Sequence, residues 1–379
     1  MASNTTAGMN AVTLDDLGLR PVINAAATLT KLGGSVMPLE VVAAMTEGAK
    51  SHLDLFALQR AVGARLAELT NNEAAFVSSG AAGGIVVAVA SVLAGTDLGK
   101  IANFPSLDGF EKTEIIVHRS QRNGYDYAAR QTGARFVEIE GTVESLEMAI
   151  GERTGAVLWF AGAHFAGGAL PVETVIEVAH RHGVPVIVDA AAQVPTIANL
   201  WKFTRDLGAD LAIFSGGKGL RGPQSSGLVL GRPDLIEGCY ANGSPNTAIG
   251  RPLKVGKEEL FGILAAVRWS LDQDEEATLA RYENIVQSWI SGLSEIPGVS
   301  VERGFPSEAG QPHGRAIVTL DESAKLDAPA LVQALWDGES CIAVSAFGTG
   351  SIALNPQSID DGEEMIVVEA IRKLLGEGE

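Results

Sequence analysis

Short apolar runs alternate with longer amphipathic segments through the first two thirds of the chain. The runs are rich in Val and Ile and end in Gly, Ser or Asp, which is typical of buried strands. The segments between them repeat apolar residues at helical spacing. Strands are expected within residues 73–80, 114–120, 135–141, 156–162, 185–191, 211–217 and 226–232. This alternation predicts an α/β fold whose mostly parallel central sheet is covered by helices on both faces.

The pattern changes beyond about residue 254, where long helical segments precede several short strands. Residues 257–296 predict two helices, and residues 341–356 predict a pair of strands. We therefore expect an N-terminal arm over residues 1–22, a large domain over 23–255 and a smaller α+β domain over 256–379. The arm is expected to pack on the large domain or on a partner subunit.

Charge and cysteine content narrow the class of protein. With 28 basic and 46 acidic residues the net charge is −18, so the surface as a whole repels nucleic-acid phosphates and anionic lipid. The two cysteines, Cys239 and Cys341, suit a reducing cytoplasm better than a disulfide framework. The first residues have no secretory pattern, and the apolar stretch 81–95 is too short and glycine-rich to span a bilayer. We expect a cytoplasmic globular protein that binds neither nucleic acid nor membrane.

Lys218 lies in a glycine-rich turn directly after the apolar run 211–215. A phosphate-binding P-loop is excluded, because the position six residues before the lysine is Ala212 and the next residue is Gly219. Two interpretations of this segment remain: a solvated surface lysine, or an amine that binds pyridoxal phosphate covalently. The second requires a desolvated lysine and close approach of a bulky cofactor, which neighbouring glycines permit.

Two further segments favour the cofactor. Asp189 ends an apolar strand, where a buried carboxylate needs a cation such as the protonated ring nitrogen of pyridoxal phosphate. The segment 77–84, VSSGAAGG, passes from a strand into a helix and offers backbone amides to a phosphate. Both segments lie at carboxyl ends of strands, where ligands of parallel sheets bind. The predicted cofactor-binding residues are Lys218, Asp189, Ala191, Ser215, Ser79, Gly80, Ala81 and Ala82.

With these motifs the chain resembles fold-type-I pyridoxal-phosphate enzymes of the aspartate-aminotransferase superfamily. More narrowly, it resembles the group that includes selenocysteine synthase and D-glucosaminate-6-phosphate ammonia-lyase. The segment 249–259, IGRPLKVGKEE, narrows the resemblance to this group. The resemblance implies a PLP-transferase fold, pyridoxal phosphate on Lys218, Asp189 on the ring nitrogen and active sites at a homodimer interface. The other segments that carry it are 22–38, 77–84, 183–195 and 214–231.

The group further implies a lyase that acts on a hydroxylated amino acid or amino-sugar acid. Lys218 is expected to act as the base at Cα, and dehydration followed by deamination then yields a 2-keto acid and ammonia. A racemase, an aldolase or a selenium transferase-like enzyme would use the same lysine and aspartate, so the sequence does not separate them. Selenium transfer is disfavoured by the acidic surface, and the strand expected at residues 20–29 leaves no room for an N-terminal tRNA-binding domain.

Two basic residues are candidates for anion binding. Arg251 and Lys254 lie close together in an otherwise acidic chain. We expect them to bind a substrate carboxylate or phosphate, or the cofactor phosphate of a neighbouring subunit, in preference to forming a solvated turn. Residues 341–356 contain no arginine, although many fold-type-I enzymes bind the substrate carboxylate with an arginine of this region. Arg251 or another cation is expected to replace it.

A side chain after the expected strand at 114–120 is predicted to stack on the outer face of the cofactor ring. Gln121 is the first candidate for this role, and His118, Arg119 and Tyr125 are the next candidates. The group often has a histidine or an aromatic side chain in this role, so a glutamine would depart from its pattern. Tyr125 is also a candidate for substrate binding.

Three further residues are candidates for the substrate side. His164 ends a strand at the expected ligand edge and is either an acid–base group or a structural histidine. Asn24 and Thr28, in the N-terminal strand, are candidates to line the substrate site, and packing explains them as well. The six histidines show no metal-ligand spacing with cysteines or carboxylates, so we expect no catalytic metal.

Overall fold

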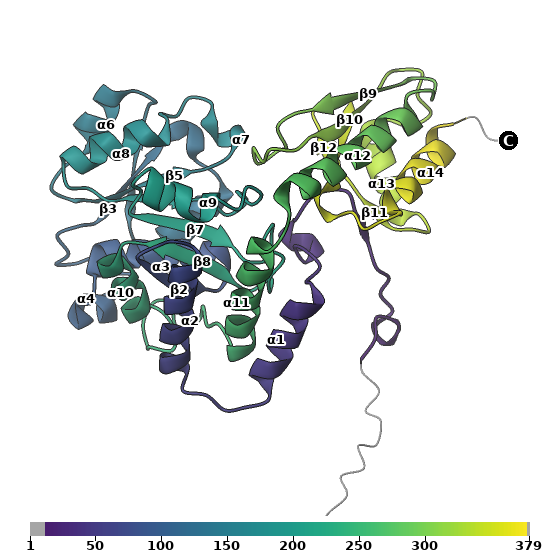
Figure 1. The fold of residues 1–379 in the computed structure, drawn as a ribbon. Coiled ribbons are helices and arrows are strands. Elements are labelled where there is room, and N and C mark those ends of the chain that lie inside the picture. Colours follow the sequence, from purple (N-terminus) through teal and green to yellow (C-terminus); the bar gives the residue numbers. More distant parts are fainter. Residues whose placement is uncertain (1–11, 377–379) are drawn as a thin grey trace, which may run out of the picture. The chain divides into compact units, whose positions relative to one another are not determined.

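The computed structural model describes residues 12–376, which form two compact units (Figure 1). The larger, called the large unit below, comprises Thr28–Tyr282 and Phe305–Gly314. The small unit comprises the described residues up to Ala27, Glu283–Gly304, and the residues from Arg315 onward. Each unit has its own sheet and its own hydrophobic core. None of the helices in the described part of the chain has both the length and the hydropathy of a transmembrane span.

The large unit is built on a sheet of seven strands. These are β2 (Ala74–Ser78), β3 (Glu114–His118), β4 (Arg135–Ile139), β5 (Thr154–Phe160), β6 (Val186–Asp189), β7 (Leu211–Ser215) and β8 (Gly227–Gly231). They lie in the order β2-β8-β7-β6-β5-β3-β4. β8 is antiparallel to its neighbours β2 and β7, and all other neighbouring pairs are parallel. The predicted mostly parallel sheet is confirmed, and β2, β7 and β6 end at the same edge.

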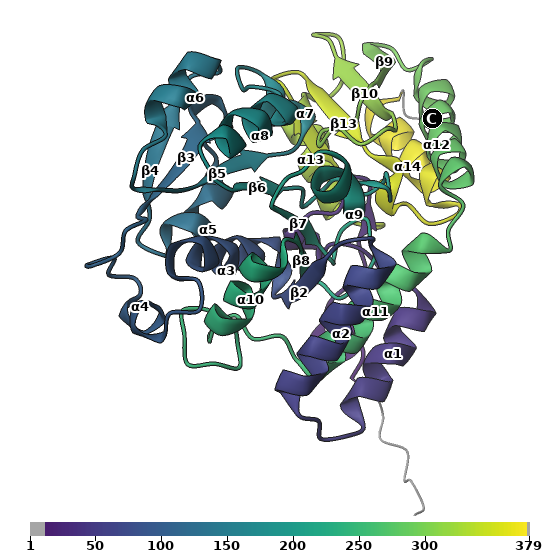
Figure 2. The ribbon, with the colours of Figure 1, turned by 60° about the vertical axis from the view of Figure 1, so that its left-hand side comes forward.

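Helices cover both faces of this sheet, as the strand–helix alternation predicts (Figure 2). One face packs against α3 (Gly80–Ala94), α4 (Leu98–Asn103), α5 (Tyr127–Arg130) and α10 (Pro233–Asn242). The other packs against α2 (Leu55–Leu69), α6 (Val143–Ala149), α8 (Val172–Arg181), α9 (Asn199–Trp201) and α11 (Lys257–Leu271). α3 approaches the sheet closely at Gly84, where a Cβ would lie 2.8 Å from Ile213 Cγ2. α1 (Leu39–Ala49) packs on α11.

The small unit combines a four-stranded antiparallel sheet with helices. Its strands are β9 (Val299–Gly304), β10 (Arg315–Leu320), β12 (Ser345–Phe347) and β13 (Ser351–Leu354), in the order β12-β13-β10-β9. Its helices are α13 (Ala328–Asp337), α14 (Glu363–Leu375) and the second part of α12 (Glu275–Leu293). Trp289 of α12 is fully buried in the core of this unit. The predicted strand pair within residues 341–356 is present as β12 and β13.

The boundary between the two units lies later in the chain than residue 256, where the sequence predicts it. The apolar face of α11, with Leu260, Ile263 and Val267, is buried in the core of the large unit. The division between the units falls inside α12, between Tyr282 and Glu283. Helical spacing shows that α11 buries one face, but it does not show which core that face joins.

The predicted N-terminal arm also packs differently from the expectation that it lies on the large domain. Residues 1–11 lie outside the described residues, and the following residues cluster with the small unit. Arg20 donates hydrogen bonds to the carbonyl oxygens of Gly338 and Trp336, at 2.5 and 2.9 Å. The short strand β1 (Ile23–Asn24) then pairs in parallel with β11 (Ile342–Ala343). The arm is therefore part of the small unit.

Candidate active site

Three segments of the large unit meet at the carboxyl edge of the sheet. Ser78, Gly227 and Ser215 are register partners across β2, β8 and β7. Asp189 ends the next strand, β6, where it pairs in register with Ile213 of β7. Because α3 begins directly after β2 and Lys218 follows β7, this register brings the start of α3, Asp189 and the lysine turn to one place.

The turn that carries Lys218 requires glycine on both sides of the lysine. A Cβ on Gly217 would lie 2.7 Å from the Cα of Gln224, and a Cβ on Gly219 would lie 2.1 Å from the carbonyl oxygen of Val194. Neither position can therefore accept a side chain without moving its neighbours. The close backbone packing holds Lys218 in a partly buried position at the end of β7.

Burial dominates the electrostatics of Asp189 and Lys218. Asp189 is 8% exposed, and its Oδ1 accepts a 3.0 Å hydrogen bond from the Ala191 N–H. Burial raises the pKa of Asp189, while the Ala191 hydrogen bond and the charge of Lys218 act in the opposite direction. Burial also lowers the pKa of Lys218, against the attraction of Asp189 and Glu308. Burial thus makes Lys218 easier to deprotonate than a solvated lysine, and the charge of Asp189 is incompletely compensated.

The start of α3 is suited to an anion. Ser79, the residue before the helix, makes no capping hydrogen bond with its side chain, and the first turn contains no acidic residue. Gly80 has a φ of +75°, and a Cβ there would meet no atom within 4 Å. The backbone amides of Gly80, Ala81 and Ala82 therefore lack a side-chain cap from Ser79, and there is open space beside Gly80. Such a helix start can hold a phosphate.

These residues together fit pyridoxal phosphate. Lys218, Asp189 and the start of α3 are called the cofactor cluster below. Ser215 and Ala191 belong to it, because the Ser215 N–H donates to the Ala191 carbonyl oxygen at 3.3 Å. A buried carboxylate can pair with the ring nitrogen, a desolvated amine can bind the aldehyde carbon, and an uncapped helix start can hold the phosphate. The structure brings these predicted cofactor-binding residues together, and Gln121 lies beside them, because its side chain bonds to Phe160, the register partner of Asp189.

Gln121 links two parts of the large unit. Its side-chain amide donates to the Phe160 carbonyl oxygen at 3.0 Å, and its Oε1 accepts from the Phe160 N–H at 3.1 Å. These bonds tie the turn after β3 to the end of β5, and the side chain has no exposed surface. The two bonds hold the Gln121 side chain in place, and its stacking on a cofactor ring stays a prediction.

The other candidates for stacking differ in exposure. His118 is fully buried, and its Nε2 accepts a hydrogen bond from the Leu170 N–H at 3.2 Å. Burial lowers the pKa of His118 to about 4, so the ring is neutral near neutral pH. Arg119 forms ion pairs with Glu138 and Glu140 on the surface. Tyr125 is 64% exposed, and its role in substrate binding stays a prediction.

The remaining candidates on the substrate side lie in different places. His164 is exposed in the short helix α7 (Ala163–Ala166), which follows β5 at the carboxyl edge. Its Nδ1 lies 2.6 Å from the carbonyl oxygen of Glu308. Asn24 belongs to the small unit, where its side chain donates to the Ala27 carbonyl oxygen. Thr28 is buried at the beginning of the large unit.

Arg251 and Lys254 line a surface cavity of about 530 Å³ in the large unit. Within the described residues, neither side chain has a hydrogen-bond or ion-pair partner, whereas the nearby Lys257 is paired with Glu258. Leu253, which lies between Arg251 and Lys254 in the chain, contacts the start of α3, because its Cδ1 lies 3.9 Å from the position of a Cβ on Gly83. Two exposed cations are therefore available to an anion near this edge.

A loop that no sequence motif marks contacts the same edge. The loop, residues 305–314, connects β9 to β10 and belongs to the large unit by its contacts. It accepts a 2.8 Å hydrogen bond from Gln193 at the Ala309 carbonyl oxygen, as well as the contact from His164. Its length was an available signal, because a connection of this size exceeds a tight hairpin turn.

Comparison with known proteins identifies similar chains. A 5'-C-glycyluridine monooxygenase-decarboxylase from Streptomyces sp is 33% identical, over 98% of this chain and 94% of its own. A D-glucosaminate-6-phosphate ammonia lyase from Salmonella typhimurium is 30% identical, over 94% of this chain and 96% of its own. The solved structure of a D-glucosaminate-6-phosphate ammonia-lyase superposes with a TM-score of 0.82 at 29% identity, covering 97% of this chain and 98% of that one.

These similarities confirm the predicted fold type I, the predicted relationship to D-glucosaminate-6-phosphate ammonia-lyase and the predicted cofactor, pyridoxal 5'-phosphate. The aminotransferase class-V family model matches residues 111–354, a range that includes Asp189 and Lys218. The chain therefore belongs to the aminotransferase class-V family of pyridoxal-phosphate enzymes.

Proposed function

We propose that this enzyme is a lyase that converts a hydroxylated amino acid or amino-sugar acid into a 2-keto acid and ammonia. The observation that carries the proposal is that a desolvated Lys218, the buried Asp189 and the uncapped start of α3 lie at the same edge of the sheet. This arrangement suits removal of a proton from the substrate Cα. Similarity over nearly the whole chain to a D-glucosaminate-6-phosphate ammonia lyase supports the reaction class.

Each residue of the cluster has a distinct task in this proposal. Bound here, pyridoxal phosphate supplies an electron sink that stabilises negative charge at Cα. Asp189 holds a proton at the ring nitrogen, and the first-turn amides of α3 bind the phosphate. Lys218 Nζ accepts the proton from Cα, for which the lowered pKa of the amine prepares it.

The reaction balances without an oxidant or a reductant. The substrate loses the Cα proton and the Cβ hydroxyl as water. Hydrolysis of the remaining carbon–nitrogen bond then consumes one water and releases ammonia. The net products are a 2-keto acid with a methylene at Cβ, and ammonia. Lys218 returns to its starting state when it gives up the proton.

The proposed substrate class rests on two observations. The names of both relatives denote an amino acid joined to a sugar-derived chain, a glucosaminate phosphate in one and a glycyluridine in the other. Arg251 and Lys254 are two exposed cations without an ion-pair partner among residues 12–376, and Leu253 between them contacts the start of α3. We propose that they bind an anionic group of such a substrate, which is either a carboxylate or a phosphate.

A second candidate function is oxygen-dependent decarboxylation, which the Streptomyces relative favours through its 33% identity over 98% of this chain. The two candidates differ in their reactants and products. Decarboxylation by a monooxygenase consumes dioxygen and releases carbon dioxide, whereas the lyase reaction does neither. The same lysine and aspartate would serve both reactions, so product analysis has to separate them.

The test is incubation of the pyridoxal-phosphate-loaded enzyme with a panel of β-hydroxy amino acids and amino-sugar acids. We expect 2-keto acid and ammonia in equal amounts under argon, and no product with Lys218→Ala. A requirement for oxygen, with carbon dioxide as product, would support the second candidate instead. Racemisation or carbon–carbon cleavage without ammonia would reject both.

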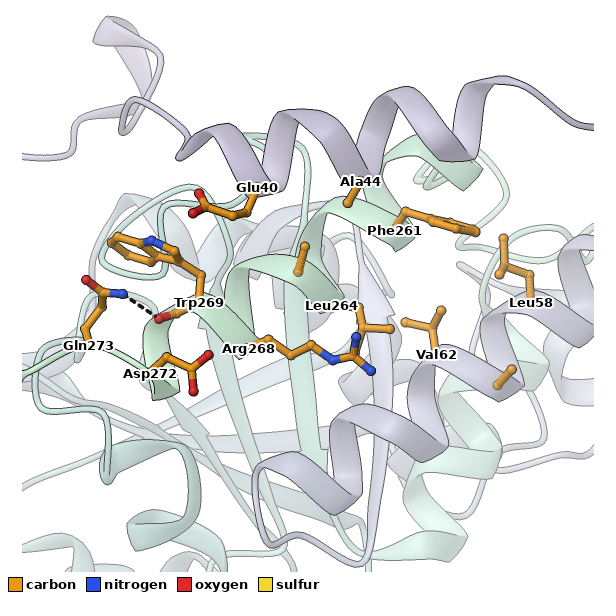
Figure 3. Close-up of a pocket in the computed structure, with 12 residues that line it drawn as sticks. Glu40, Ala44, Leu58, Val62, Phe261, Leu264, Arg268, Trp269, Asp272 and Gln273 are labelled. Carbon is orange, nitrogen blue, oxygen red and sulfur yellow. Dashed lines mark hydrogen bonds between the residues drawn. The ribbon is translucent and has the colours of Figure 1, made fainter.

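We further propose that the chain forms a homodimer. A groove of about 630 Å³ runs between α1, α2 and α11, and apolar side chains dominate its walls (Figure 3). Large apolar side chains are also exposed on and around α1 and the start of α2: Val36, Leu39, Val42, Leu53 and Phe56. Several exposed apolar side chains on and around neighbouring helices are typical of an interface. Light scattering that shows only monomer at micromolar concentration would contradict the dimer.

We propose a cytoplasmic location for the enzyme. Cys239 and Cys341 are both buried and unbonded, which suits a reducing compartment. Cell fractionation tests this directly, and recovery of the protein outside the cytoplasmic fraction would contradict it.

A further inference from the structure

The turn that carries Lys218 contains an arginine in a backbone conformation that glycine normally adopts. Arg221 has a φ of +53°, in the left-handed region, although four glycines lie within the same stretch, residues 216–222. Its N–H donates to the Lys218 carbonyl oxygen at 2.9 Å, and the Gly222 N–H donates to the Gly216 carbonyl oxygen at 2.7 Å. A side chain in this conformation costs free energy, so it persists only where surrounding contacts hold it.

Side-chain contacts hold Arg221 to two other elements of the large unit. Its Nε donates to the carbonyl oxygen of Val36, shortly before α1, at 2.8 Å. The central carbon of its guanidinium lies 5.5 Å from the ring centroid of Trp269 in α11, which Figure 3 labels. The next residue of α11, Ser270, donates its hydroxyl to the Leu220 carbonyl oxygen at 3.3 Å. The turn is therefore fixed directly after Lys218 from two directions.

Residues 34–36 also hold the residue before the lysine. The Ser35 hydroxyl donates to the Gly217 carbonyl oxygen at 3.0 Å. A Cβ on Gly34 would lie 2.3 Å from that same oxygen, so the two main chains are in close contact. Lys218 thus lies between two hydrogen-bonded anchors on one segment, Ser35 before it and the Val36 carbonyl oxygen after it.

The tasks of Lys218 require a fixed main chain and a mobile side chain. Its amine binds the cofactor covalently and, once released, takes a proton from the substrate Cα. The side chain has to reach both positions from one Cα. A displacement of about 1 Å can slow such a step about 100-fold. Groups that hold the main chain of this turn therefore affect both cofactor attachment and proton transfer.

We propose that Arg221 and Ser35 are positioning residues that hold the main chain on either side of Lys218 and so direct its amine toward the cofactor aldehyde and the substrate Cα. Ser35 acts through the Gly217 carbonyl oxygen. Arg221 acts through its N–H bond to Lys218 while its side chain is anchored on Val36. The part of this inference that concerns turnover rests on the lyase function proposed above, whereas the part that concerns cofactor attachment does not.

The first test measures how fast the cofactor attaches. Cofactor-free protein is mixed with pyridoxal phosphate, samples are reduced with borohydride at successive times, and the labelled Lys218 peptide is quantified by mass spectrometry. Arg221→Gln and Ser35→Ala should each lower the rate of attachment about 10-fold, because the amine is no longer held toward the aldehyde. Ser35→Thr keeps the hydroxyl and should recover most of the loss.

Two matched controls remove the same kinds of hydrogen bond elsewhere. Arg372 Nε donates to the Gly292 carbonyl oxygen at 2.6 Å in the small unit. The Thr46 hydroxyl donates to the Val42 carbonyl oxygen at 2.9 Å within α1. Arg372→Gln and Thr46→Ala should leave attachment and turnover within about 2-fold of wild type.

Arg221→Gly separates positioning from a general loss of structure. Glycine adopts the left-handed conformation without strain but has no side chain to bond to Val36. This variant should therefore unfold at a higher urea concentration than Arg221→Gln and still attach the cofactor slowly. Attachment at the wild-type rate in Arg221→Gly would overturn the role of the arginine side chain.

Turnover gives a second readout in the loaded enzyme. Arg221→Gln should lower kcat about 100-fold and change KM less than about 3-fold, because the guanidinium does not bind the substrate. Combined with Ser35→Ala, it should lower kcat by less than the product of the two single effects, since both residues act on one turn. A raised KM with unchanged kcat would overturn the inference and make Arg221 a substrate-binding residue.

The outcomes separate this inference from the proposed function. If the wild-type protein attaches the cofactor at Lys218 but releases no keto acid, the lyase function fails, and the attachment rates still test the positioning role. If Arg221→Gln and Ser35→Ala attach the cofactor as fast as wild type, the positioning role is overturned whatever the reaction is.

Discussion

The two edges of the large-unit sheet each hold a buried aspartate, and the two are bonded very differently. Asp210, at the amino end of β7, contacts His180 Nε2 at 2.9 Å, accepts from the Val186 N–H at 2.7 Å and forms an ion pair with Arg232. Asp189, at the carboxyl end of β6, accepts one hydrogen bond, from Ala191. Asp210 is satisfied by the protein itself, whereas Asp189 is not.

This difference in bonding partners distinguishes a buried carboxylate that stabilises the fold from one that is available to a ligand. A buried carboxylate costs free energy unless it is paired, so a fold keeps one with weak compensation only where a ligand completes it. The carboxyl edge of a parallel sheet is where such ligands bind. The same residue type therefore contributes to stability at one edge and to chemistry at the other.

The largest expected effect is on activity when Lys218 is replaced. Lys218→Ala should lower kcat by at least about 1,000-fold, because it removes both the covalent attachment of the cofactor and the base at Cα. The free energy of unfolding of the cofactor-free protein should not fall, since a desolvated amine is removed. Steady-state kinetics and urea unfolding check the two parts. Activity within 10-fold of wild type would break the assignment of this edge as the active site.

Matched substitutions of the two aspartates test the comparison directly. Asp189→Asn should lower kcat roughly 100-fold with little loss of stability, because the carboxylate is poorly compensated in the fold. Asp210→Asn should instead lower the free energy of unfolding by about 2 kcal/mol, since it disrupts a buried ion pair and its hydrogen bonds. Its kcat per folded molecule should stay unchanged. The opposite pattern would refute the distinction between the edges.

His118 shows that a residue at the carboxyl edge can still be structural. Burial lowers the pKa of His118 from 6.5 to about 4, so the unfolded chain binds a proton that the folded protein excludes between these values. The fold should lose up to about 3 kcal/mol of stability as the pH falls from 6.5 to 4 on account of this residue. His118→Gln keeps an acceptor for the Leu170 N–H and should remove this part of the pH dependence. Urea unfolding at several pH values measures it, and equal slopes for both proteins would contradict the assignment.

The smallest expected effect concerns the exposed cations. Arg251→Gln should raise KM for an anionic substrate about 10-fold and leave kcat nearly unchanged, because the side chain binds without taking part in the chemistry. Lys112→Gln, which removes a partly exposed cation outside this cavity, serves as the control. If the substitution of Arg251 weakens retention of pyridoxal phosphate instead, the cation serves the cofactor and not the substrate.

The sequence predicts the cofactor cluster well because its signals are local. Lys218 and Asp189 each follow an apolar strand, and parallel strands bring such positions to one edge whatever the loops do. The glycines that flank Lys218 likewise reflect a local backbone requirement. A Cβ on Gly219, for example, would clash with the carbonyl oxygen of Val194. These features depend on strand ends and turns, so one sequence is sufficient to find them.

What the sequence does not predict depends on contacts between distant segments. The amphipathic pattern of α11 does not show that it packs in the large unit, and the polar character of Gln121 does not show that it bonds to Phe160. The attachment of Glu308 beside the cofactor cluster is of the same kind, because it joins residues more than one hundred positions apart. Such contacts are set by tertiary packing, which single-sequence patterns do not encode.

The central claim is that Lys218 binds the cofactor covalently at this edge, and one measurement tests it most directly. The purified enzyme is loaded with pyridoxal phosphate, reduced with borohydride, digested and analysed by mass spectrometry beside Lys218→Ala. The account predicts a visible absorbance band that disappears on reduction, with the reduced cofactor on the peptide containing Lys218 and no label in the variant. A label on another lysine, or a wild-type protein that takes up no cofactor, would contradict it.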